Sequence, residues 1–291
     1  MMSLIDSSDL IDQAGWQGNL QLEFRHRNGE TILSRSLMQA PLKIQRPFYP
    51  EGKSICHGVM LHTAGGIVGG DRLSSEIHLH PNAQVLLTTA AATKVYGSNQ
   101  ESNQVIDIQV AKNAGLEWLP QETIIFDGAR YRQSVRVELE PGATWLGWDI
   151  TRLGRSARGE QFLSGEWRSH LEVWQGGQLL WVDPQWLLGG SEMLQSAHGL
   201  SGCAVAGSFG FVGREVSREF VAEVRSLLAG EGDAPEFPAA EMGATRLMNG
   251  FLCRYRGSST TEAKQQFIQV WDLLRRHYLE RSRCLPRVWQ M

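Results

Sequence analysis

Cysteine is scarce in this sequence, and its few cysteines lie far apart. Among the 291 residues there are four, Cys56, Cys203, Cys253 and Cys284, and none belongs to a Cys-x-x-Cys pair. Structural zinc sites and thioredoxin-like motifs both need closely spaced cysteines. We therefore expect buried free thiols and no tightly bound cofactor.

A large excess of one charge and long hydrophobic runs are absent as well. The formal net charge is -3, so charge alone gives no reason to expect a nucleic-acid partner. The apolar stretches are too short to span a bilayer. Residues 1–12 carry three aspartates and no basic residue, which is unlike a signal peptide. These features predict a cytoplasmic protein with no nucleic-acid or membrane partner.

Complete nucleotide-binding and hydrolase motifs are also missing. The glycine-rich segment 65–71 is followed by Arg72, whereas a P-loop continues with Lys and Ser or Thr. Its paired glycines favour a backbone role, with Asp71 bonding to neighbouring amides. Residues 206–210 resemble a nucleophile elbow around Ser208, but the first position is Ala. An autonomous hydrolase that uses Ser208 or a carboxylate pair is one alternative function.

A repeat organises the central part of the chain. Four segments each contain an alternating strand, a short turn and a second apolar strand, and the turns lie at residues 81–83, 112–114, 141–143 and 175–177. The second strands are apolar on both faces, which indicates burial on both faces. The repeats predict an all-β protein with β-helical, solenoid-like stacked strands over residues 71–190. A plain β-sandwich is the structural alternative.

The two ends of the chain show sequence patterns that differ from the central repeats. Asn28-Gly29 predicts a hairpin after an alternating segment. Near the other end, Arg214–Leu228 predicts an amphipathic helix, residues 245–255 predict a strand pair, and Ser259 begins a capping-box pattern before a second helix. We predict a β-helical body over residues 1–212 and a helix-containing region, 213–291, packed on the same body.

Three acidic residues within the repeats need an explanation. Asp149 and Asp183 share one position in the aligned repeats, and Glu117 stands where the other three repeats have leucine. A buried carboxylate costs several kcal/mol unless it is paired or hydrogen-bonded. One interpretation is ion pairing with the nearby arginines Arg152, Arg155 and Arg158. The other is a polar path for a cation inside the β body, with Asp149 and Asp183 as neighbours.

Several ordered stretches resemble the urease accessory protein family UreD, also called UreH. They are residues 45–51, 61–62, 65–71, 92–98, 117–122, 148–149, 153–155 and 285–289. Two stretches differ from the family pattern. Relatives commonly have two prolines where Thr63-Ala64 stand, and an aromatic residue, Tyr and Arg where Val95-Tyr96-Gly97 stand.

The resemblance implies a β-helical fold with helices near the C-terminus and a scaffold that is not an enzyme. It implies binding to apo-urease, and joint action with UreF and the GTPase UreG to install nickel. Nickel would pass through the interior, and Asp71, Thr93, Glu117, Asp149 and Asp183 are the candidate residues of that path. A carbohydrate-binding β-solenoid is another alternative, but the repeat tryptophans occupy positions that are predicted to be buried.

Overall fold

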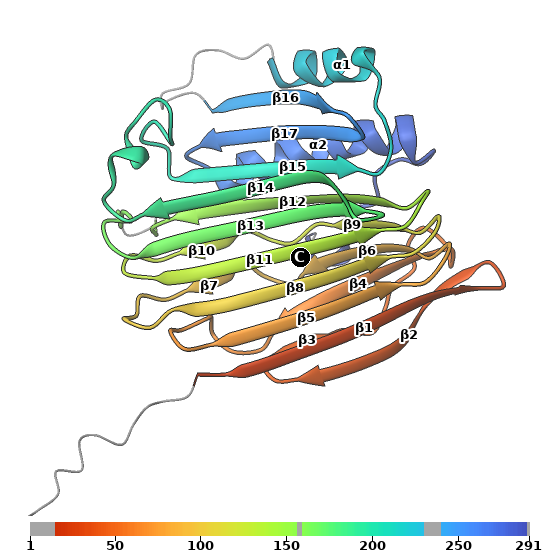
Figure 1. Cartoon of the computed structure of the whole chain (residues 1–291), viewed down its shortest axis with the longest axis horizontal. Coiled ribbons are helices and arrows are strands. Elements are labelled where there is room, and N and C mark those ends of the chain that lie inside the picture. The colour runs from red at the N-terminus through yellow and green to blue at the C-terminus, as the bar shows by residue number, and fades with distance from the viewer. Residues whose placement is uncertain (1–14, 156–158, 230–239, 290–291) are drawn as a thin grey trace, which may run out of the picture.

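Two large β-sheets lie face to face in this protein, and two helices cover one of them (Figure 1). The structure is a computed structural model that describes residues 15–155, 159–229 and 240–289. Strands dominate and the helices follow the central strands, so the predicted all-β class with two C-terminal helices is confirmed. The acidic segment 1–12 and Arg158 lie outside the described residues.

The first sheet has seven strands, and nothing in the described chain covers its outer face (Figure 1). In spatial order the strands are β14 (Gln178–Leu188), β13 (Glu166–Gln175), β11 (Arg130–Leu139), β8 (Ser102–Val110), β5 (Arg72–Leu79), β1 (Gln17–Arg27) and β2 (Glu30–Gln39). β1 and β2 form the predicted hairpin, with Asn28 and Gly29 at positive φ in its turn.

The second sheet has ten strands, and its central strands are buried on both faces. Its main order is β16 (Glu241–Leu247), β17 (Gly250–Gly257), β15 (Val205–Val212), β12 (Thr144–Leu153), β9 (Gly115–Trp118), β6 (Gln84–Thr89), β4 (Ile55–His62) and β3 (Leu42–Ile44). The short strands β7 (Thr93–Val95) and β10 (Thr123–Ile125) join it beside β12. The predicted strand pair near residue 250 is β16 and β17.

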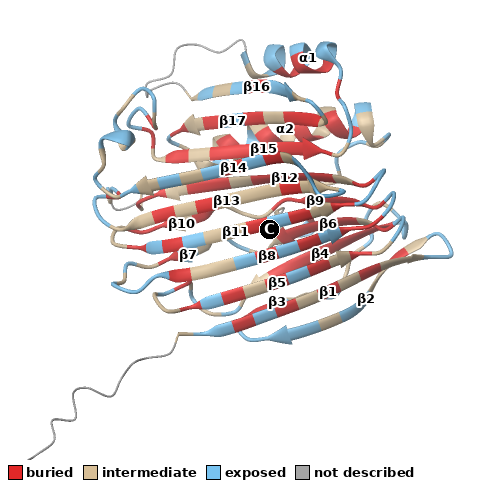
Figure 2. Cartoon of the chain, in the orientation of Figure 1, coloured by how far each residue is buried: buried red, intermediate tan, exposed pale blue. Residues whose placement is uncertain are grey.

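The repeats place alternate strands in the two sheets. β5, β8 and β11 pair in parallel in the first sheet, and β6, β9 and β12 pair in parallel in the second. Each turn between them has one residue at positive φ, namely Asn82, Asn113 and Gly142. β6, β9 and β12 are buried on both faces (Figure 2), which confirms the prediction for the first three repeats. The prediction is wrong for the fourth, because alternate residues of its second strand, β14, are exposed.

The fourth repeat departs from the alignment. Gly176 and Gly177 both have positive φ, a geometry that suits a two-residue hairpin turn. The chain therefore returns antiparallel to β13 as β14 and stays in the first sheet. The expectation that Asp183 stacks beside Asp149 within one set of strands is wrong, because the two residues come from facing sheets.

The helices pack on the far side of the second sheet. α1 (Arg218–Ala229) lies against β16, and α2 (Thr260–Tyr278) lies across β12, β15 and β17. Phe267 and Trp271 of α2 are fully buried in this layer. None of the described helices is both long and apolar enough to cross a membrane.

The tryptophans at the repeat positions are buried, as the sequence predicts. Trp118, Trp145, Trp148 and Trp181 expose at most 7% of their surface. A carbohydrate-binding ladder would need these rings at the surface, so their burial removes the feature on which that alternative depended.

The N-cap of α2 gives a direct stability prediction. The Ser259 side chain accepts a hydrogen bond from the Glu262 amide at 3.2 Å. Ser259→Ala should lower the free energy of unfolding by about 1 kcal/mol, measured by urea denaturation. Ser258→Ala is the matched control one residue away, and an equal loss in both variants would contradict the capping role.

Candidate functional site

Three of the five predicted path residues line one cavity between the sheets. Thr93 of β7, Asp149 of β12 and Asp183 of β14 all border a cavity of about 70 Å³. Apolar rings, Trp118, Trp145 and Trp181, form much of the remaining wall. The cavity is thus a polar pocket inside an otherwise apolar core.

The first sheet contributes a continuous polar row to this cavity. Gln104, Gln133, Ser169 and Gln185 are register partners on four neighbouring strands, and all four line the cavity. Side chains of paired residues on one face lie about 5 Å apart. The row therefore carries amide and hydroxyl groups across the sheet, from β8 to its edge at β14.

The second sheet opposes this row with polar groups of its own. Asp149 pairs in register with Ser208 on β15, and both line the cavity. Thr93 and Thr123 are register partners on β7 and β10, and Thr123 also borders the cavity. Oxygen atoms therefore face the cavity from both sheets.

Among the described residues, only neutral groups donate hydrogen bonds to the Asp149 carboxylate. Its carboxylate accepts hydrogen bonds from Thr151 and Ser169 at 3.3 Å and from Gln133 at 3.4 Å. These bonds are long for a charged acceptor. Burial, together with the charge of Asp183, raises the pKa of Asp149 to about 6. A cation nearby would therefore stabilise the charged Asp149 carboxylate.

Asp183 has a cationic partner. Its carboxylate lies 2.7 Å from a guanidinium nitrogen of Arg254, whose side chain is 46% exposed. The predicted pairing with nearby arginines is wrong for both aspartates among the described residues, since Arg152 donates to the Ser258 carbonyl and Arg155 pairs with Glu160. The partner of Asp183 is distant in sequence, and only the pairing of β15 with β17 brings it close.

Asp71 lies outside the cavity and has a structural role. Its carboxylate accepts hydrogen bonds from the amides of Trp16 and Val68, at 2.8 and 2.9 Å. It is fully buried and joins the glycine-rich segment to the start of β1. The sequence-based interpretation of Asp71 as a partner for neighbouring amides is confirmed, and its place on a cation path finds no support in this geometry.

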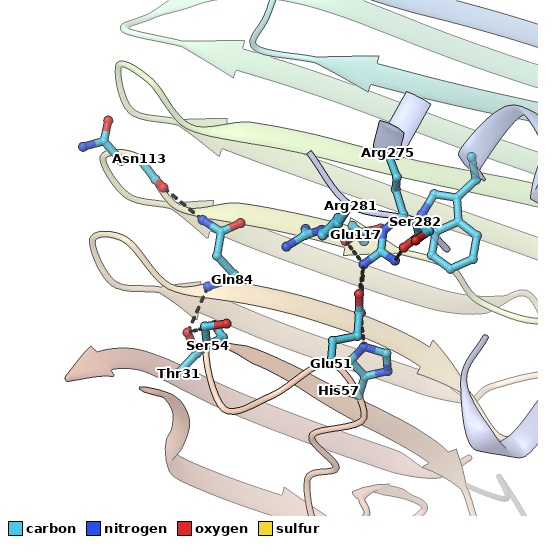
Figure 3. Close-up of polar contacts among 11 residues, drawn as sticks. Thr31, Glu51, Ser54, His57, Gln84, Asn113, Glu117, Arg275, Arg281 and Ser282 are labelled. Atoms are coloured by element: carbon cyan, nitrogen blue, oxygen red, sulfur yellow. Dashed lines mark hydrogen bonds and ion pairs between the residues drawn. The ribbon is translucent and has the colours of Figure 1, made fainter. Parts of the chain in front are cut away.

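Glu117 also lies outside the cavity, on the opposite face of the second sheet. Its carboxylate accepts a hydrogen bond from the Trp271 indole. It also lies 3.1 Å from the guanidinium of Arg275 and 2.7 Å from that of Arg281. Figure 3 shows these arginines reaching it from α2 and the segment that follows. Glu117 therefore fastens the helix layer to β9.

The same cluster continues to a second acid, Glu51, whose side chain is 11% exposed (Figure 3). Glu51 lies 2.8 Å from Arg275 and 2.7 Å from His57. Burial alone would raise the pKa of Glu51, but hydrogen bonds from His57 and Arg275 outweigh burial and lower it to about 2. The cluster links the segment before β4, strand β9 and the C-terminal region through charge-assisted contacts.

Ser208 does not occupy a nucleophile elbow. It lies in the middle of β15 between two paired strands, whereas the elbow is a strand-to-helix turn. Its hydroxyl accepts hydrogen bonds from Gln185 and Arg254 at 3.2 and 3.1 Å.

In the described residues, no group of three or more His, Cys, Asp or Glu could hold a metal ion.

The glutamines of the first sheet are the functional candidates that the sequence reading missed. Gln104 and Gln133 stand at inward positions of strands on which most other inward residues are apolar, such as Ile106 and Val135. Polar residues that interrupt the apolar side of an alternating strand were therefore an available signal.

The raised pKa of Asp149 predicts a pH dependence of stability. The pKa of Asp149 is near 4 in the unfolded chain and about 6 in the native state. Between pH 4 and pH 6 the native state therefore binds the proton more tightly, and the free energy of unfolding falls as the pH rises through this range. Asp149→Asn should remove this slope and raise the free energy of unfolding at pH 7.5 by about 1–3 kcal/mol. Denaturation at pH 4.5 and 7.5 measures it, and an unchanged slope would contradict the assignment.

The ion cluster predicts a large cost for removing Glu117. Glu117→Leu restores the residue of the other repeats but leaves Arg275 and Arg281 without that carboxylate. The free energy of unfolding should fall by about 3–5 kcal/mol. As a control, Glu138→Leu removes the exposed pair with Arg136 and should cost under about 1 kcal/mol. Similar losses in the two variants would show that the buried cluster has no special role.

Known proteins resemble this chain along almost its whole length. The family described as UreD urease accessory protein matches residues 17–290. A urease accessory protein UreD from Nostoc punctiforme is 58% identical over 278 residues, 95% of this chain and 97% of the relative. One from Trichormus variabilis is 55% identical over 277 residues, 95% of this chain and 96% of the relative. One from Acaryochloris marina is 51% identical over 292 residues, the full length of both. This chain therefore belongs to the UreD family of urease accessory proteins.

Proposed function

We propose that this chain helps to insert nickel into apo-urease as a scaffold in a complex with UreF and the GTPase UreG. The observation that carries the proposal is the polar cavity between the sheets, with Asp149 and Asp183 among its walls. We propose that nickel in transit passes through this cavity. We also propose that the protein acts in the cytoplasm and that its stacked parallel strands form a β-helix.

The chemistry of the cavity suits a passing cation. An ion that enters an apolar interior loses its water, and carboxylate, amide and hydroxyl oxygens can replace that water. The raised pKa of Asp149 reflects an unfavourable negative charge, which a divalent cation would stabilise. Nickel binds more tightly to imidazole or thiolate ligands, so oxygen ligands favour passage over storage.

Arg254 fits the proposal as a gate, because it contacts two of the residues that line the cavity. Its guanidinium contacts Asp183 at 2.7 Å and Ser208 at 3.1 Å, and nearly half of its side chain is exposed. While it holds Asp183, it repels a second cation. Rotation of this side chain toward solvent would free Asp183 for the metal.

The lack of a P-loop assigns the energy-consuming step to a partner. Residues 65–71 end in Asp71 and continue as strand β5 instead of a helix, and the Asp71 carboxylate is occupied by two amides. Hydrolysis of GTP would then belong to the GTPase, and this chain would supply the route and the docking surfaces.

A conservative double variant tests the conduit. Asp149→Asn with Asp183→Asn keeps the shape of both side chains and removes both charges. We expect at least a tenfold lower yield of nickel-loaded, active urease, with the accessory complex still assembled in pull-down. The Asp183 change leaves a half-exposed arginine, which should cost under about 1 kcal/mol.

Asp107→Asn is the matched control, since Asp107 is an exposed strand aspartate on the outer face of the first sheet. Thermal melting, pull-down and urease nickel content are measured on one preparation of each variant. Normal nickel content in a stable double variant would eliminate the conduit role of these two aspartates.

A further inference from the structure

The outer face of the first sheet carries an unusual apolar stripe at one edge. Val182, Pro184, Trp186 and Leu188 alternate along β14, and all four point outward and are exposed. Trp186 is 62% exposed and Leu188 46%. The stripe spans six residue steps, or about 20 Å of strand, which is more than a small ligand would cover.

A row of arginines leads from this stripe across the same face. Arg72, Asn103, Arg132, Arg168 and Trp186 are successive register partners on five neighbouring strands. In the described part of the chain, Arg72 and Arg132 form no ion pair with a carboxylate. Arg168 pairs with Glu166 of its own strand at 2.5 Å. The positive charge that no described carboxylate pairs with therefore lies at Arg72 and Arg132.

Trp186 is held rigidly in spite of its exposure. Its indole donates to Glu166 at 2.8 Å, and the Arg168 guanidinium lies 5.0 Å from its ring centre. A fixed, exposed tryptophan beside arginines has the composition of a binding hot spot, because little side-chain entropy is lost when it is covered.

A groove lies beside the indole, directly above the interior cavity. It is bordered by Arg132, Arg168, His170 and Trp186 on the outside. Gln133, Ser169 and Gln185 border both this groove and the cavity. A protein that covers the groove would therefore lie at the β14 end of the polar row.

Strand addition at the free edge of β14 is disfavoured. Pro184 pairs with His170, and a proline fits an edge strand when its nitrogen faces away from the neighbour. The free edge then lacks a donor near its centre, which blunts pairing with another strand. A partner would therefore contact the exposed side chains of the stripe and would not pair with the edge of β14.

We propose that this surface docks a protein partner that presents a strip of carboxylates beside an apolar cleft. The carboxylates would face Arg72 and Arg132, and the cleft would receive Trp186. Charge complementarity selects the acidic strip, and the length of the apolar stripe selects a protein over a small anion. The inference rests on the proposed function, because the partner is taken from the urease maturation complex.

The test measures binding of the full chain to purified apo-urease, UreF and UreG, each alone and in 0.05–0.5 M NaCl. Trp186→Ala, and Arg72→Glu with Arg132→Glu, should weaken binding to one of the three at least tenfold, and that binding should weaken with salt. The controls are Leu37→Ala, an apolar residue 48% exposed on the opposite edge strand, and Arg27→Glu at the β1–β2 turn. Both controls should bind like the wild type.

The outcomes separate the two proposals. Unchanged binding of the variants to every partner that the wild type binds overturns the docking surface alone. If the wild type binds none of the three, the proposed complex and this surface both fail. If the variants lose only binding to an RNA duplex or to anionic phosphatidylserine vesicles, the occupant is a different macromolecule and the proposal is wrong.

Discussion

Burial of the central strands of the second sheet on both faces is the constraint on which the rest of the structure depends. One face packs on the first sheet, and the other packs on α2 and the C-terminal segment. A polar side chain that enters either face is removed from water and needs a partner. The two acids that enter these faces, Glu117 and Asp149, meet this requirement in opposite ways.

The charge of Glu117 is fully compensated by its partners. Two guanidinium groups and an indole surround its carboxylate, so no site remains for a passing ion. Its partners come from α2 and the chain after it, which means that the cluster also orders the C-terminal region. Trp289 extends this attachment, since its indole donates to Thr88 at 3.0 Å and stacks on Trp148.

Asp149 is left undersatisfied, and this difference separates a functional candidate from a structural one. Burial and the nearby charge of Asp183 outweigh the long hydrogen bonds from neutral groups and raise its pKa to about 6. A protein that needed only stability could place an apolar residue there. The cavity between the sheets and the uncovered face above it then lie on opposite sides of one strand layer, so cargo and partner would meet across β13 and β14.

The sequence by itself determined the strand pattern, because alternation, two-sided apolar strands and turn residues are local properties. It predicted the Asn28-Gly29 hairpin, the cap at Ser259 and the family membership. Tertiary structure alone decided which acids face the cavity. Glu117 and Asp149 stand three positions apart in the aligned repeats, so they point to opposite faces of one sheet, and only the docking of α2 makes the first an ion-pair site. The paired glycines at 176–177 turned β14 back into the first sheet, so Asp183 reached Asp149 from across the core.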